Sequence, residues 1–123
     1  MGTFVISQRL SGVYKYEFTS RKGKTIFTSN DFELRFEAEE EIERLKAALD
    51  VIVFMRFRSP RGKFYFKMIL DKVELAKSRQ YTTQLLMQKG IDEIMRSLAS
   101  SEILDFSSSD EIFPPAEDVF GVW

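Results

Sequence analysis

Five residues near the middle of the chain combine positive charge with an aromatic ring: Arg56, Arg58, Lys63, Tyr65 and Lys67. Alternate side chains of an extended strand point to the same face. Lys63, Tyr65 and Lys67 are therefore expected to share one face, and Arg56 and Arg58 one side of the preceding strand. If both sets emerge on one open sheet face, they form a basic platform that binds single-stranded nucleic acid or another anionic ligand. The simpler alternative is that these bases keep the sheet face soluble and prevent edge-to-edge pairing.

Charge is unevenly distributed along the chain, although the net charge is only -1. Residues 56–79 hold eight basic residues and two acidic ones, a local charge of +6. Residues 102–123 hold six acidic residues and no basic one, a local charge of -6. The near balance of the two blocks favours the solubility interpretation, because nucleic-acid-binding domains are usually basic overall.

The C-terminal segment provides a second candidate of a different class. Residues 111–123 alternate acids with apolar side chains, which suits a short motif that docks on another protein. Phe113, Phe120 and Trp123 are the predicted partner-binding residues. The surface they bind could be the chain's own basic strands, and a frayed terminus is the competing interpretation.

Composition excludes most catalytic chemistry. The chain has no His and no Cys, which removes serine triads, thiolate catalysis and most transition-metal sites. Its six Gly residues are scattered singly, so no glycine-rich phosphate loop is present. We therefore expect no enzyme activity, no cofactor and no metal, and we assign no catalytic residue.

Acidic residues are the remaining catalytic possibility. The glutamates of residues 37–43 lack the spacing of a calcium loop, and on a helix they fan around its outer face. Asp31 and Glu33 could form an acid pair near a strand end, although nothing in the sequence gives the short separation that such catalysis needs. Both groups are more simply explained as solvated polar residues.

Hydrophobic periodicity predicts the elements that would position these residues. Strands are expected at residues 3–8, 12–19 and 25–28, with turns at Ser11–Gly12 and at residues 21–23. Ala38, Ile42, Leu45 and Leu49 then step by four, three and four, which predicts a helix of about twelve residues with one buried stripe. Residues 51–58 are expected to form a strand that closes this half and opens the next.

The same plan is repeated at an offset of fifty and then forty-nine residues. Strands are predicted at residues 63–70 and 74–77, a tight turn near Asp71 and Lys72, a helix at residues 83–99 and a closing strand at residues 102–106. The buried stripe of this second helix is expected to consist of Met87, Ile91, Ile94 and Leu98. Gly90 lets the helix approach the sheet. We therefore predict one domain at residues 1–106, built from two repeats of residues 3–52 and 53–106, because each is too small to bury a core alone. Residues 107–123 are expected to form a flexible or docked tail.

These repeated motifs resemble the YegP-like family of small bacterial proteins of unknown function. The matching residues are Gly62-Lys63-Phe64-Tyr65-Phe66-Lys67 and Gly90-Ile91 in the second half, and Gly12-Val13-Tyr14-Lys15-Tyr16, Thr28-Ser29 and Phe32 in the first. The resemblance implies an α+β fold in which tandem β3-α-β repeats form one antiparallel sheet with pseudo-twofold symmetry, exchanged closing strands and two packed helices. It also implies a monomer that contains its own internal partner, and it provides no catalytic residues.

A soluble cytoplasmic protein with no membrane partner is expected. The longest wholly apolar run, residues 51–55, is far shorter than the roughly 20 residues that span a bilayer. The N-terminus has no signal-peptide pattern. Nucleic acid and another protein remain the two possible partners.

Overall fold

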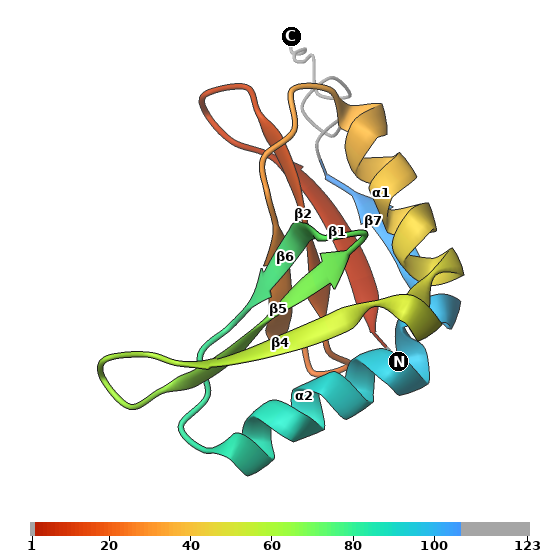
Figure 1. Ribbon diagram of the computed structural model, residues 1–123. Helices are drawn as coiled ribbons and strands as arrows, with labels where there is room; N and C mark the ends of the chain where they lie inside the picture. The colour runs from red at the N-terminus through yellow and green to blue at the C-terminus, as the bar shows by residue number, and fades with distance from the viewer. Residues whose placement is uncertain (1, 107–123) are drawn as a thin grey trace, which may run out of the picture.

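The computed structural model describes residues 2–106, which form a seven-stranded sheet with two α-helices (Figure 1). The strands are β1 (Thr3–Gln8), β2 (Tyr14–Thr19), β3 (Thr25–Ser29), β4 (Val53–Arg58), β5 (Phe64–Leu70), β6 (Val73–Ser78) and β7 (Glu102–Asp105). The helices are α1 (Arg35–Ala47) and α2 (Gln84–Ser97), and the short 3-10 helices Leu49–Val51 and Leu98–Ser100 follow them. The predicted elements are confirmed to within about two residues at most ends.

Two glycine turns set the register of the hairpins β1–β2 and β4–β5. Gly12 and Gly62 adopt φ values of +96° and +80°, which residues with a side chain rarely adopt. The loops close with matching hydrogen bonds, from Arg9 N–H to the Val13 carbonyl at 2.8 Å and from Ser59 N–H to the Lys63 carbonyl at 2.7 Å. The predicted tight turn between β5 and β6 lies at Asp71 and Lys72.

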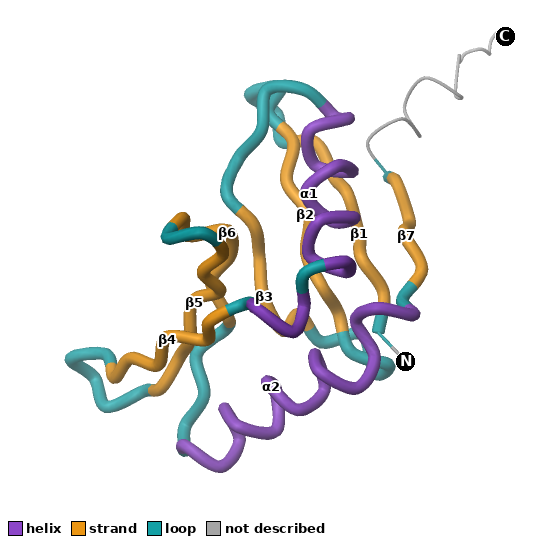
Figure 2. The backbone as a smooth tube through the Cα atoms, turned by 45° about the vertical axis from the view of Figure 1, so that its right-hand side comes forward, coloured by secondary structure: helices purple, strands orange, loops and turns teal. Residues whose placement is uncertain are grey.

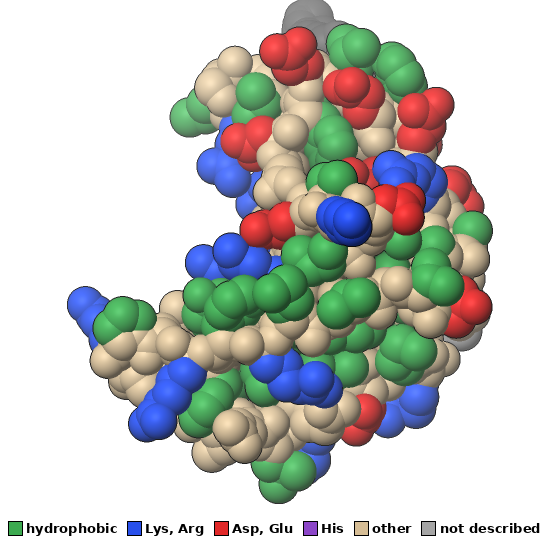
Figure 3. Space-filling model, in the orientation of Figure 1, with side chains coloured by type: hydrophobic (Ala, Val, Ile, Leu, Met, Phe, Trp, Pro, Cys, Tyr) green, Lys and Arg blue, Asp and Glu red, His purple; other side chains and the backbone are tan. Residues whose placement is uncertain are grey.

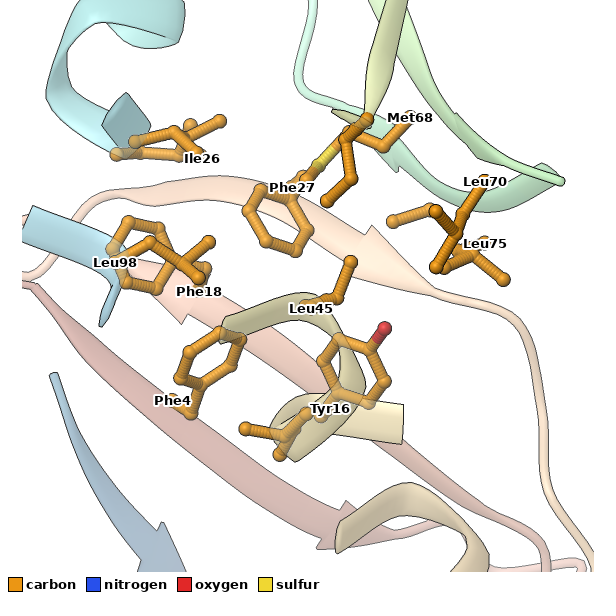
Figure 4. Packing of buried hydrophobic residues seen from close by; sticks show 14 of the residues in the cluster. Phe4, Tyr16, Phe18, Ile26, Phe27, Leu45, Met68, Leu70, Leu75 and Leu98 are labelled. Carbon is orange, nitrogen blue, oxygen red and sulfur yellow. The ribbon is translucent and has the colours of Figure 1, made fainter. Parts of the chain in front are cut away.

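The core lies between the sheet and the two helices. Rings of Phe4, Phe18 and Phe27 pack closely, with centroids 5.0 Å apart for Phe4 and Phe18 and 5.4 Å apart for Phe18 and Phe27 (Figure 4). Seven of the eight predicted stripe residues are buried in the same core; they are Ala38, Ile42, Leu45, Met87, Ile91, Ile94 and Leu98. The eighth, Leu49, lies in the 3-10 helix after α1 and is half-buried. In Figure 2, α1 lies over β1 and β2, and α2 runs along the group of β4 and β5. Neither helix is long and apolar enough to cross a membrane within residues 2–106.

The sheet is mixed, which corrects the prediction of an entirely antiparallel one. Its strand order is β4-β5-β6-β3-β2-β1-β7, and β7 pairs with β1 in parallel from Thr3↔Glu102 onwards. The two strands begin at the same end of the sheet, because α2 and the 3-10 helix after it return the chain to the end where β1 starts. The other five strand pairs are antiparallel.

The pairing of β3 with β6 joins the first three strands to the second three. Its register is Phe27↔Ser78, Thr28↔Lys77 and Ser29↔Ala76. Backbone hydrogen bonds extend it on both sides, from Arg79 N–H to the Ile26 carbonyl at 2.9 Å and from Asn30 N–H to the Leu75 carbonyl at 3.4 Å. This short ladder makes one continuous sheet of the two groups of strands.

In each half a tyrosine hydroxyl lies next to the helix, but the tyrosine comes from a different position in the two halves. In the first half, the Tyr16 hydroxyl donates to a Glu41 carboxylate oxygen, and the Tyr16 ring stacks on Phe32 with centroids 5.9 Å apart. In the second half, Phe66 occupies the position corresponding to Tyr16, and the tyrosine is Tyr81 instead. Gly90 of α2 leaves the space that the Tyr81 hydroxyl fills.

Gly90→Ala is therefore expected to destabilise the protein although alanine favours helices. The added Cβ would overlap the Tyr81 hydroxyl and lie 3.0 Å from the ring carbon that bears it. We expect this overlap to cost about 1–3 kcal/mol, which exceeds the gain of about 1 kcal/mol from replacing a helical glycine. Urea unfolding of the wild type and the variant measures the difference.

Tyr81→Phe provides the matched background for this test. Without the hydroxyl, Gly90→Ala should cost about 1 kcal/mol less than in the wild type, because part of the steric overlap is gone. Equal effects in both backgrounds would show that Tyr81 is not the reason for the glycine.

Candidate functional site

Two of the five predicted ligand-binding residues, Tyr65 and Lys67, lie on the face of the sheet that carries no helix. They alternate along β5 with the buried Phe66 and Met68. The Tyr65 ring stacks on Phe57 of β4, with centroids 5.2 Å apart and planes inclined by 17°. The prediction that these β5 side chains point away from the core is confirmed.

Arg56 and Arg58 lie on the opposite face, beside α2. The Arg56 guanidinium donates to Gln88 Oε1 at 2.7 Å, and the Arg58 guanidinium lies 5.7 Å from the centroid of Phe64. The five predicted residues are therefore divided between the two faces, and Lys63 lies in the turn before β5. The strand register explains this division: Arg58 pairs with Phe64 and Arg56 with Phe66, and residues directly opposite in an antiparallel pair share a face.

Phe57 and Lys77 are the residues that sequence reasoning missed on the helix-free face. Lys67 Nζ lies 5.3 Å from the Phe57 centroid, and Lys77 Nζ lies 4.9 Å from the Tyr65 centroid. Both distances are in the range of cation–π attraction. The hairpin register places Phe57 opposite Tyr65, and the β5–β6 register places Lys67 opposite Lys77. We call Phe57, Tyr65, Lys67 and Lys77 the aromatic–lysine face.

A polar hollow of about 390 Å³ lies where β3 meets β6 and adjoins this face through Lys77. It is also lined by Thr28, Asn30, Glu74 and Arg79. Figure 3 shows the molecule hollowed on the side away from α1, with basic and acidic side chains on its walls. Lys67 Nζ is 3.2 Å from Glu74 Oε1, so one of the two lysines is partly neutralised.

Several of the acidic residues considered for catalysis have separate structural partners. Asp31 pairs with Arg9 at 3.3 Å, Glu39 pairs with Arg35 at 3.2 Å, and Glu37 Oε1 accepts the Leu34 N–H at 3.0 Å. Within residues 2–106 no three acidic side chains gather as a metal site would require. These contacts stabilise α1 and the loop before it, as helix-terminal and i,i+4 pairs do.

Glu41 is the acid whose titration is most altered. Desolvation raises the pKa of Glu41 above its ordinary value, against the opposing effects of the Tyr16 hydrogen bond and the Arg44 charge. Burial, together with the nearby Glu41 charge, also raises the pKa of Tyr16. This hydrogen bond connects α1 to β2 inside the first half. Within residues 2–106, neither Tyr16 nor Glu41 lines the hollows beside α1, beside α2 or between β3 and β6.

The predicted partner motif of Phe113, Phe120 and Trp123 lies outside the described residues. It stays a prediction from the sequence.

Two solved structures are similar to this chain. The solution NMR structure of a UPF0339 protein from Shewanella oneidensis has a TM-score of 0.78 and 18% sequence identity, over 86% of this chain and 92% of that chain. The solution NMR structure of YegP from E. coli, a protein of unknown function, has a TM-score of 0.74 and 21% identity, over 86% of this chain and 93% of that chain. No protein-family model and no curated protein matches the chain.

The resemblance predicted from the repeated glycine and aromatic motifs is confirmed at the level of the fold. The fold alone assigns no ligand, because unrelated functions can occupy one fold. A function must therefore be argued from the aromatic–lysine face and the surfaces around it.

The half-buried position of Glu41 predicts a distinctive pH dependence for Glu41→Gln. Because the pKa of Glu41 is raised above 4.5 in the folded state, the folded protein binds more protons than the unfolded chain between 4.5 and that raised value. Wild-type stability is therefore lost as pH rises through this window. Glutamine still accepts the Tyr16 hydrogen bond but does not ionise, so the variant should gain stability relative to the wild type from about pH 4 to about pH 7.

Urea unfolding at both pH values measures this difference, and Glu39→Gln on the exposed side of the same helix is the control. A Glu41→Gln effect that is independent of pH would contradict the expectation, as would an equal pH dependence for Glu39→Gln.

Proposed function

We propose that this chain, which has the YegP fold, is a binding protein without catalytic function whose aromatic–lysine face takes single-stranded nucleic acid or a similar extended anion. One observation carries the proposal: two stacked rings on the helix-free face each have a lysine ammonium within 5.3 Å of the centroid. Flat apolar surface and positive charge are the two features that such ligands need side by side.

The rings support stacking of a base. Phe57 and Tyr65 come from adjacent strands and are half-buried, so each is held by the sheet while part of it remains accessible. Ordering a flexible ring on binding costs entropy, and a ring held in place by its neighbour avoids much of that cost. A base that stacks on such a ring gains about 1–3 kcal/mol.

The cations support recognition of a phosphate. Lys77 has no carboxylate within ion-pair distance among residues 2–106, and it lines the polar hollow together with Arg79. The Arg79 guanidinium lies 5.4 Å from the Tyr81 centroid. A strand of nucleic acid that stacks on Tyr65 could therefore place a phosphate between Lys77 and Arg79. Glu74 lies on the same side, so we expect modest affinity that salt reduces.

Binding is favoured over catalysis because the charged residues of this face are mainly cations. The carboxylate that contacts this face, Glu74, is engaged by Lys67 at 3.2 Å, and hydrolysis by acids needs two carboxylates at a defined separation. The composition adds to this, since no imidazole or thiol is present anywhere in the sequence.

We also infer that the domain is a duplicated unit with internal twofold symmetry. The register between β3 and β6 supports this inference: an offset of 49 residues converts Phe27↔Ser78 into Ala76↔Ser29 and leaves Thr28↔Lys77 unchanged. Further support comes from two matching hydrogen bonds, Tyr16 N–H to Ser29 Oγ and Phe66 N–H to Ser78 Oγ, both 2.9 Å long. A duplicated chain contains its own partner, so a cytoplasmic monomer remains our expectation.

Tyr65→Leu and Lys77→Glu are expected to weaken the binding of a labelled oligothymidylate of about ten nucleotides. Loss of one stacking ring should raise the Kd about tenfold. Lys77→Glu should weaken binding by a similar factor and lower the dependence of log K on log salt by about one. Fluorescence anisotropy across a salt series, with the full chain, measures both effects.

Arg58→Glu is the matched control, because it makes the same charge change on the other face of the sheet. We expect it to alter the Kd by no more than about twofold through long-range electrostatics. The proposal fails if the wild type shows no salt-sensitive binding, or if Arg58→Glu weakens binding as much as Lys77→Glu.

A further inference from the structure

The outer edge of β4 presents backbone groups that no strand of residues 2–106 pairs with. β4 is the first strand in the sheet order, and its only partner is β5. Phe66 N–H is directed to Ser78 Oγ at 2.9 Å, away from β4, so Arg56↔Phe66 is a pair without ladder hydrogen bonds. The N–H and C=O of Arg56 are therefore directed outward, along with those of its alternate neighbours Phe54 and Arg58.

A groove of about 620 Å³ runs between this edge and the first turns of α2. Arg56 and Arg58 line its strand side, and Leu85 and Met87 line its helix side. Leu85 is a large apolar residue, yet 67% of it is exposed. This groove therefore combines the unpaired edge of β4, apolar side chains of α2 and the two cations Arg56 and Arg58.

The corresponding place in the first half is filled by β7. There, β7 lies along β1 with Ile103 opposite Phe4 and Asp105 opposite Ile6, and Phe106 N–H donates to the Ile6 carbonyl at 2.8 Å. Ile103 packs against the core, and Asp105 Oδ2 lies 2.9 Å from Arg35 Nη1 of α1. β7 therefore adds an apolar side chain and, two residues later, an acidic one.

The pairing of β7 with β1 suggests how a further strand would pair with β4, because the residues of the two halves correspond. Phe4 and Ile6 correspond to Phe54 and Arg56 at the fifty-residue offset, and Arg35 corresponds to Gln84. In the second half the cation is thus on the strand, at Arg56, instead of on the helix. A strand added beside β4 would bring its acidic residue next to Arg56 rather than next to the helix.

We propose that the β4 edge and its groove bind an extended acidic peptide segment of a partner protein by strand addition. The segment carries an apolar residue beside Phe54 and, two positions later, an Asp or Glu beside Arg56, and it runs parallel to β4. Backbone hydrogen bonds provide the general affinity of such strand addition, and the alternate side chains provide its specificity. The proposal uses the correspondence between the two halves and is independent of nucleic-acid binding on the helix-free face.

Charge decides the class of occupant. If two copies of this chain paired through β4, Arg56 and Arg58 of each would gather in the same short ladder, which like-charge repulsion disfavours. An acidic segment instead neutralises the two cations that line the groove.

The probe is a blocked hexapeptide with the sequence of residues 101–106, Ser-Glu-Ile-Leu-Asp-Phe. Titrated into the ¹⁵N-labelled full chain, it should shift the amide signals of residues 54–58 and 84–88 in a saturable way. Arg56→Glu should raise the Kd of this peptide about tenfold or more, because a favourable charge pair becomes a repulsive one. A peptide with Lys in place of the Asp should bind the wild type weakly and bind the Arg56→Glu variant more tightly than the original peptide does.

Arg21→Glu, an equal charge change in a distant turn, is the control and should leave the Kd within about twofold. Tighter binding of the Lys-containing peptide to the Arg56→Glu variant would support the site, because a misfolded variant would not gain affinity for that peptide. Signals that shift only in β1 and β7, or the absence of any shift, would overturn the proposal. A dimer that Arg56→Glu dissociates would also overturn the proposal, because the occupant would then be a second copy of the chain. The same holds if the signals of residues 107–123 shift in this variant without peptide, because the occupant would then be the chain's own segment.

Discussion

The short pairing of β3 with β6 is the interaction on which the rest of the fold depends. Each group of three strands would otherwise end in an open edge, at Thr25–Ser29 on one side and Val73–Ser78 on the other. Phe27 of β3 and Ala76 of β6 lie on the two paired strands, and both are fully or almost fully buried. A large residue and a small one at corresponding positions fill the middle of the core where two large ones would clash. The ladder and this packing therefore stabilise the same contact.

Three strands and a helix follow one another in the same order in each half, but the buried polar groups differ. The first half buries a hydroxyl on β2 and pairs it with Glu41, and the second half buries Phe66 at that position and leaves space for Tyr81 by means of Gly90. A buried polar group is costly unless it has a partner. In the first half Glu41 is that partner, whereas the second half has Phe66 at the position of Tyr16 and needs no partner there. Positions of this kind tolerate substitution only as a set.

Local patterns made most of the fold predictable from the sequence. Gly12 and Gly62 mark hairpin turns by their conformational freedom, and the alternation on each side fixes which residues face the core. The direction of β7 could not be read in this way, because it depends on where α2 returns the chain. The aromatic–lysine face was only half predicted: Tyr65 and Lys67 follow from alternation within β5, but Phe57 and Lys77 lie on other strands. Finding them requires the cross-strand register, and the same register separates Arg56 and Arg58 from Tyr65.

The two ends of the sheet differ for a topological reason. A chain that repeats three strands and a helix twice has one closing strand left over after the second helix, and that strand can cover only one edge. Here β7 covers β1, while the linker after α1 continues directly into β4, so no strand within residues 2–106 covers the outer edge of β4. An open edge with exposed apolar residues invites aggregation unless charge protects it. Val53 and Met55 are 55% and 46% exposed on one face of β4, and Arg56 and Arg58 occupy the other. The same arginines that resist pairing with a like-charged copy admit an acidic strand, so protection of this edge and selectivity for its occupant have one physical cause.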